Sequence, residues 1–249
     1  MVCIQCRDVT FRDIQAIVFD KDGTLADSQD FMRNLGFKRA RLLDAQIPGA
    51  GEALLVACGI EGDRVDPTGL MAVGSRHENE IAAAAFVAET GRSWWESLAV
   101  ARKAFAQAER AIDVATPSPL FVGSLDVLQN LADAGLKLGI LSADTPERVQ
   151  QFVREHQLDR YIRVQMGVDL GPSKPDPVLF ERACASLGVS PHEALMVGDS
   201  PLDIEMAKKA NAAGCIGICW ESPIAAHLQT ADVTIAQLDE IRVLAETSR

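Results

Sequence analysis

The chain has 249 residues, of which 48% are hydrophobic and 24% are charged, and its net charge is −11 at pH 7. This mixture is typical of a globular protein and excludes a disordered or repetitive chain. The acidic balance argues against a nucleic-acid binder, which usually presents a basic surface. No uncharged apolar run approaches the roughly 18 residues of a membrane span, and the charged N-terminal segment does not fit a signal peptide. We therefore expect a cytoplasmic protein that binds neither nucleic acid nor membranes; the oligomeric state stays open.

Six cysteines are too few for a disulfide scaffold in a chain of this length. Cys3 and Cys6 form a single C-x-x-C pair, whereas a structural zinc needs four ligands. We interpret this segment as a short N-terminal strand, with zinc binding as the alternative.

The first clear element is an apolar run at 14–19, rich in β-branched residues and too short for a helix, which predicts a buried parallel strand. Residues 28–115 then show helical spacing and no convincing strand. Two S-x-x-E capping boxes, at Ser75 and Ser93, predict the starts of a helix pair.

After Pro119 the pattern alternates strictly between helix and strand. Helices are predicted at 125–134, 146–156, 177–187 and 202–210, and strands at 136–141, 162–166, 194–197, 215–219 and 232–235. Such alternation indicates a Rossmann-like α/β fold, a doubly wound parallel sheet with helices on both faces.

The helical segment interrupts this core directly after its first strand. We therefore predict a core made of residues 1–27 and 116–249 and an inserted all-α cap at 28–115. Ligands of doubly wound sheets bind at the carboxyl ends of the strands, where this insertion leaves the core. The cap is thus expected to cover the site as a lid.

Polar side chains follow the carboxyl ends of the predicted strands. They comprise four aspartates, a serine and a lysine: Asp20, Asp22, Ser142, Lys174, Asp199 and Asp203. Clustered carboxylates repel one another unless a cation compensates them, and oxygen ligands of this kind suit Mg²⁺ together with a substrate phosphate oxygen. The lysine, the hydroxyl and the loop amides suit an anionic phosphoryl group.

In their order and spacing, D-K-D-G-T at 20–24, Ser142, Lys174 and G-D-x-x-x-D at 198–203 resemble the four motifs of the haloacid dehalogenase superfamily. The cap between the first two motifs resembles the subgroup that contains phosphoglycolate phosphatases and β-phosphoglucomutases. The resemblance implies a Mg²⁺-dependent phosphatase of small phosphorylated metabolites, such as phosphoglycolate or sugar phosphates. A phosphomutase that uses the same aspartyl-phosphate is the alternative.

The resemblance also implies a role for each motif residue. Asp20 would be the nucleophile, Asp22 the general acid and base, and Lys174 the cation that neutralises the phosphoryl group. The phosphate would be bound by Gly23, Thr24, Ser142, Ala143 and Lys174. The metal would be held by Asp20, the carbonyl of Asp22 and Asp199. Asp203 would complete the metal site, either by binding the metal through water or by orienting Asp199. Thr24 would in addition help to hold Asp22.

Each of these residues also has a structural interpretation by itself, such as a turn, a helix cap or a solvated charge. A binding protein with no catalytic activity is therefore a third hypothesis. Asp22 argues against carbon–halogen cleavage, since relatives with that activity generally lack it. Lys21 departs from the Phe or Leu that is commoner between the two aspartates, and we expect its side chain to point away from the phosphate.

The predicted cap offers two candidates for contact with the substrate, Arg76 and His77. They begin a helix after a loop that two glycines interrupt. Arginine in the first turn is unfavourable for the helix dipole, which leaves room for a functional reason. A solvated helix start is the alternative.

Overall fold

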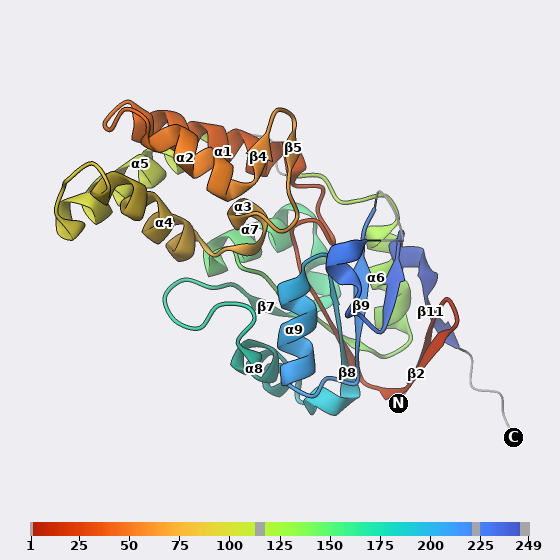
Figure 1. Ribbon diagram of the computed structural model, residues 1–249. Helices are drawn as coiled ribbons and strands as arrows, with labels where there is room; N and C mark the ends of the chain where they lie inside the picture. The colour runs from red at the N-terminus through yellow and green to blue at the C-terminus, as the bar shows by residue number, and fades with distance from the viewer. Residues whose placement is uncertain (1, 113–117, 221–224, 245–249) are drawn as a thin grey trace, which may run out of the picture. The chain divides into compact units, whose positions relative to one another are not determined.

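A computed structural model describes residues 2–112, 118–220 and 225–244. The chain forms two compact units, Met1–Asp27 with Pro119–Arg249 and Ser28–Ser118 (Figure 1). The predicted boundary between 115 and 116 lies within residues 113–117, outside the described residues. Among the described residues, every helix is either too short or too polar to span a lipid bilayer.

The first unit is built on a six-stranded parallel sheet in the order β10-β9-β8-β3-β6-β7. Its strands are β3 (Ala16–Phe19), β6 (Lys137–Leu141), β7 (Ile162–Met166), β8 (Ala194–Gly198), β9 (Gly214–Ile218) and β10 (Val233–Ile235). The Rossmann-like core expected from the helix and strand alternation is confirmed. β3, which precedes the inserted unit, lies at the centre of the sheet between β6 and β8.

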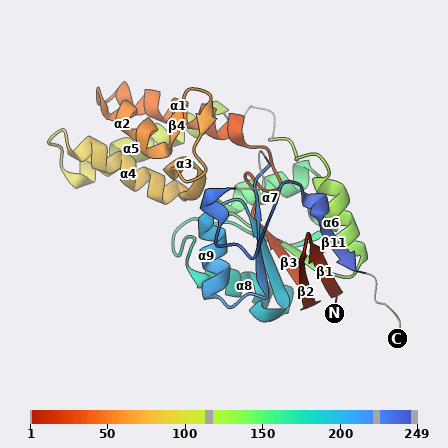
Figure 2. The same ribbon diagram turned by 45° about the vertical axis from the view of Figure 1, so that its right-hand side comes forward.

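Helices cover both faces of this sheet because its central strands are apolar on both faces, as the fully buried run of β3 shows. Ile17 and Phe19 pack on the face covered by α6 (Ser124–Asp133) and α7 (Pro146–Glu155). Ala16 and Val18 pack on the opposite face, under α8 (Pro177–Leu187) and α9 (Pro201–Lys209) (Figure 2). Full burial of one such large apolar side chain contributes about 1.5–3 kcal/mol. The core thus holds β3 rigidly, and with it the residues that follow.

A small antiparallel sheet in the order β11-β1-β2 accompanies the core. It consists of β1 (Val2–Cys6), β2 (Val9–Ile14) and β11 (Ile241–Leu244). The strand expected at 14–19 is β3, which begins two residues later, because Ile14 ends β2 and Gln15 separates the two strands. The N-terminal strand expected around Cys3 and Cys6 is present.

The second unit packs four longer helices around an apolar centre that includes Leu43, Leu54 and Phe105. They are α1 (Gln29–Asp44), α2 (Ala50–Cys58), α4 (Arg76–Ala88) and α5 (Trp94–Ile112), and a short helix, α3 (Leu70–Val73), precedes α4. Both predicted capping boxes form, with reciprocal hydrogen bonds between Ser75 and Glu78 and between Ser93 and Glu96.

The prediction that this unit is wholly helical was wrong at one point. A two-stranded hairpin joins β4 (Ile60–Glu61) to β5 (Arg64–Val65). Gly59 and Gly62 adopt φ of 69° and 59° beside it, a left-handed conformation that glycine tolerates without steric cost. Two-residue strands carry too little alternation to be recognised in a sequence.

Candidate active site

Three of the predicted aspartates gather at the carboxyl edge of the sheet. Asp20, Asp199 and Asp203 each offer one oxygen, and these oxygens lie within 4.8 Å of one another. Asp20 follows β3 and Asp199 follows β8, two strands that pair in register through Phe19 and Val197. Asp203 is added by the first turn of α9. The arrangement therefore follows directly from strand order and from the short turn between β8 and α9.

Lys174 joins this cluster from the loop before α8. Its Nζ lies 2.6 Å from Oδ1 of Asp20 and 2.7 Å from Oδ1 of Asp203. Burial by itself would lower the pKa of Lys174, but the carboxylates of Asp20 and Asp203 outweigh it and raise that pKa above its ordinary value. The two carboxylates thus favour the charged form of Lys174.

One ammonium does not balance three carboxylates. Burial raises the pKa of Asp20, and the neighbouring carboxylates add to this while Lys174 opposes it. Burial likewise raises the pKa of Asp199 well above its ordinary value, with further contributions from Asp20 and Asp203. The cluster consequently fits an additional hard cation that prefers oxygen ligands.

Two glycines allow the backbone to approach these carboxylates closely. A Cβ on Gly23 would lie 2.0 Å from Oδ2 of Asp199, and a Cβ on Gly198 would lie 2.4 Å from Oδ2 of Asp203. Gly23 also has φ of 78°, in the left-handed region. Any side chain at either position would displace a carboxylate of the cluster.

Gly23 and Thr24, in the loop after Asp20, make contacts within the protein, and the roles predicted for them stay predictions. The amide of Gly23, expected to bind phosphate, donates to the carbonyl of Ala26 at 2.9 Å and so closes the loop. The hydroxyl of Thr24, expected to hold Asp22, donates to Oδ1 of Asp199 at 3.4 Å. Both residues thus shape the site through the loop and the carboxylate cluster.

Ser142 follows β6, which pairs with β3 on the side opposite β8. It is buried, its amide donates to the carbonyl of Met166 at 2.9 Å, and its hydroxyl accepts the amide of Asp144 at 3.1 Å. Half-buried Ala143 comes next in this loop. Ser142 thus stands at the same sheet edge as Asp20, the arrangement that the predicted phosphate-binding role requires.

Asp22 forms an ion pair with Lys21, a residue that sequence reasoning did not select for the site. Lys21 is buried, and its Nζ lies 2.5 Å from Oδ2 of Asp22 and 3.3 Å from Oδ2 of Asp144. The only signal in the sequence was the unusual lysine itself. Its partner Asp144 is more than 120 residues away and is brought near by the pairing of β3 with β6.

Trp220 is a further residue that sequence reasoning missed. Its indole nitrogen donates to the carbonyl of Gly23 at 3.1 Å, and its ring stacks on Phe121 with centroids 4.1 Å apart. It thereby supports the loop that carries Asp22. Trp220 follows β9, and no local sequence pattern predicts that a tryptophan at this place contacts the loop after β3.

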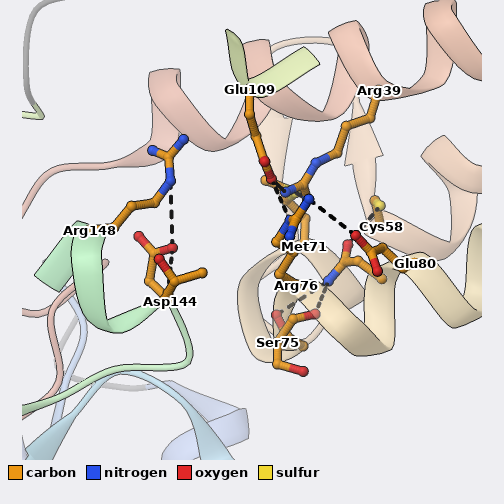
Figure 3. A network of polar contacts seen from close by, with 12 residues as sticks. Arg39, Cys58, Met71, Ser75, Arg76, Glu80, Glu109, Asp144 and Arg148 are labelled. Carbon is orange, nitrogen blue, oxygen red and sulfur yellow. Dashed lines mark hydrogen bonds and ion pairs between the residues drawn. The ribbon is translucent and has the colours of Figure 1, made fainter. Parts of the chain in front are cut away.

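Arg76 and His77, the predicted specificity residues, begin α4 in the second unit. Arg76 is bound within that unit, with its guanidinium 2.8 Å from Glu109 and 3.2 Å from Glu80 (Figure 3). Arg39 also reaches Glu109, at 3.2 Å, and is buried. A structural function for Arg76 is therefore present in the fold, and its contact with substrate stays a prediction, as does that of His77.

Comparison with known proteins is consistent with this site. Residues 14–211 match the haloacid dehalogenase-like hydrolase family. A phosphoglycolate phosphatase of Yersinia pestis is 31% identical over 217 residues, covering 85% of this chain and 84% of its own. A pyrophosphatase PpaX of Anoxybacillus flavithermus is 32% identical over 128 residues, covering 50% of this chain and 59% of its own. The chain spans about half the length of the PpaX pyrophosphatases that it matches.

The fold has close counterparts among solved structures. One of a predicted phosphoglycolate phosphatase from Haemophilus somnus 129pt aligns with a TM-score of 0.68 at 21% identity. That alignment covers 91% of this chain and 95% of the other. Since the family match extends over most of the sequence and includes all four motifs, this chain belongs to the haloacid dehalogenase-like hydrolases.

Proposed function

We propose that the protein is a Mg²⁺-dependent phosphatase of small phosphomonoesters that works through an aspartyl-phosphate on Asp20. The observation that carries the proposal is the contact of Asp20 with Lys174 at 2.6 Å, inside a cluster that also contains Asp199 and Asp203. A carboxylate at this position is held by a cation and directed at the edge of the sheet where ligands of such folds bind.

Two displacements account for the reaction. In the first, an oxygen of Asp20 attacks phosphorus, the ester P–O bond breaks, and the leaving oxygen takes a proton from Asp22. In the second, water attacks the aspartyl-phosphate and gives a proton to Asp22, and the bond to Asp20 breaks to release phosphate. Splitting the reaction into these steps replaces one difficult displacement by two easier ones.

The remaining residues would stabilise charge in both displacements. Lys174 would neutralise the phosphoryl oxygens as negative charge shifts between the entering and leaving groups, and Ser142 would donate a hydrogen bond to one of them. Asp20, the carbonyl of Asp22, Asp199 and Asp203 would hold Mg²⁺. When bound, Mg²⁺ would supply positive charge beside the transferring group.

Phosphoglycolate is the substrate that we place first, since the phosphoglycolate phosphatase of Yersinia pestis matches 85% of this chain. The decisive experiment measures phosphate release from phosphoglycolate, hexose phosphates, nucleotides, glycerol phosphate, pyrophosphate and an aryl phosphate, each with Mg²⁺ and with a chelator. We expect release that requires the metal and prefers one ester.

Two variants make this experiment specific. Asp20→Asn removes the proposed nucleophile, and we expect it to abolish phosphate release. Asp133→Asn changes an exposed aspartate at the end of α6, and we expect it to have no effect. Substantial turnover by Asp20→Asn would contradict the aspartyl-phosphate mechanism. Conversion of glucose 1-phosphate to glucose 6-phosphate without net phosphate release would favour the phosphomutase instead.

A further inference from the structure

Lys21 is a buried lysine between the two aspartates of the first motif, with 6% of its surface exposed. Lysine is almost never this buried unless its charge is paired. Its ammonium is bound between two carboxylates, at 2.5 Å from Asp22 and 3.3 Å from Asp144, and lies 5.6 Å from the ring centroid of Phe152. It thus links the loop after β3 to the loop after β6.

Asp144 is itself held from several sides. Its carboxylate accepts the amide of Thr145 at 2.9 Å, and its carbonyl accepts the amide of Val168 at 2.8 Å. Its amide is bound by the hydroxyl of Ser142, and the guanidinium of Arg148 lies 3.9 Å from its carboxylate (Figure 3). Asp144 is therefore a fixed anchor for the ammonium of Lys21, and the ammonium is in turn a fixed partner for Asp22.

We propose that Lys21 is a positioning residue that, anchored by Asp144, holds the carboxyl group of Asp22 in place for catalysis. The inference rests on the proposed function, because it takes Asp22 to be the group that handles the proton of the leaving oxygen. Without the ammonium, the carboxylates of Asp22 and Asp144 would face each other with no cation between them and would move apart. A displacement of about 1 Å at a reacting group is enough to slow a reaction about 100-fold.

Misplacement of Asp22 should slow the reaction by an amount that depends on the leaving group of the substrate. An alkyl phosphate expels a strongly basic alkoxide and needs a well-placed proton donor, whereas an aryl phosphate such as p-nitrophenyl phosphate expels a weak base and does not. The parameter kcat/KM reports steps up to departure of the leaving group, so it isolates this effect from the later hydrolysis of the aspartyl-phosphate.

The test compares Lys21→Met with Lys21→Arg, using the best alkyl phosphate of the panel and p-nitrophenyl phosphate. We expect Lys21→Met to lower kcat/KM for the alkyl ester about 10–100-fold, mainly through kcat, and for the aryl ester less than about 3-fold. Lys21→Arg keeps the charge and should recover much of the loss. Lys209→Met removes a lysine that pairs with Glu205 on the surface of α9, and it should leave both substrates unaffected.

Asp144→Asn gives a second test that does not depend on the folding of the Lys21 variants. It weakens the anchor and should produce a smaller loss with the same preference for the alkyl ester. Equal losses on the two substrates, or no loss on either, would overturn the role of Lys21 while leaving the phosphatase intact. A wild-type enzyme that hydrolyses no ester, or an active Asp20→Asn variant, would contradict the proposed function itself.

Discussion

Nζ of Lys174 lies 2.6 Å from Oδ1 of Asp20, although the two residues are 154 positions apart in the chain. The same ammonium reaches Asp203 at 2.7 Å. It is therefore the cation that allows two carboxylates to be buried side by side, and this relationship joins the stability of the core to its chemistry.

Replacing Lys174 by Met should both abolish phosphatase activity and destabilise the protein. Removal of one partner from a buried ion pair leaves uncompensated charge and costs about 3–5 kcal/mol. Urea unfolding in the presence of a chelator measures this cost. Added Mg²⁺ should restore part of the lost free energy of unfolding, because the metal would supply positive charge in place of Lys174. A variant as stable as wild type would show that the carboxylates are not charged in the folded state.

The contribution of Asp20 and Asp199 to the stability of the metal-free protein should fall as the pH rises from about 4 to 8. Burial raises the pKa of Asp20 and of Asp199, so the folded state binds more protons than the unfolded chain, in which an aspartate has a pKa of about 3.9. The stabilising contribution is therefore complete below that value and is lost as the pH passes through the raised pKa values.

Asp199→Asn tests this directly, because an amide does not titrate. In the absence of metal, the melting temperature of the variant minus that of the wild type should increase from pH 5 to pH 8. Asp133→Asn serves as the control with no such trend, since its side chain is exposed. A constant difference between the Asp199→Asn variant and wild type would contradict the raised pKa of Asp199.

Gly23→Ala should inactivate the enzyme. Its Cβ would lie 2.0 Å from Oδ2 of Asp199, so the carboxylate of Asp199 must move. The backbone at this position is also strained for alanine, because its φ is 78°. We expect a loss of kcat of about 100-fold, the size that a displacement of about 1 Å produces. Gly135→Ala is the matched control, because Gly135 has φ of 87° and open space around its Cβ position. It should lose about 1 kcal/mol of stability, with activity unchanged.

Glu109→Gln should destabilise the second unit. Glu109 binds two guanidinium groups, those of Arg39 at 3.2 Å and Arg76 at 2.8 Å, and Arg39 is buried with its guanidinium 4.4 Å from the ring centroid of Phe105. Loss of the charge should cost about 1–3 kcal/mol, as for a hydrogen bond to a buried charged group. Arg102→Met, which removes a half-exposed partner of Glu80, should cost less than about 1 kcal/mol. Urea unfolding of the two variants gives the comparison.

The α/β core, the helical segment that interrupts it and the polar residues at the ends of its strands are predictable from the sequence. These depend on local patterns: alternating helices and strands, capping boxes at Ser75 and Ser93, and polar residues directly after apolar strands. Because parallel strands end at a common edge, the sequence also implied that Asp20 and Asp199 would meet.

Which groups are joined across that edge follows from the three-dimensional arrangement of the strands and loops. The pairing of β3 with both β6 and β8 brings Asp144 to Lys21, and close approach of the backbone brings Thr24 to Asp199. The indole of Trp220 reaches Gly23 in the same way. Such contacts depend on strand order, on side-chain direction and on distances of 3.1–3.4 Å between residues far apart in the chain, and no local pattern in the sequence encodes them.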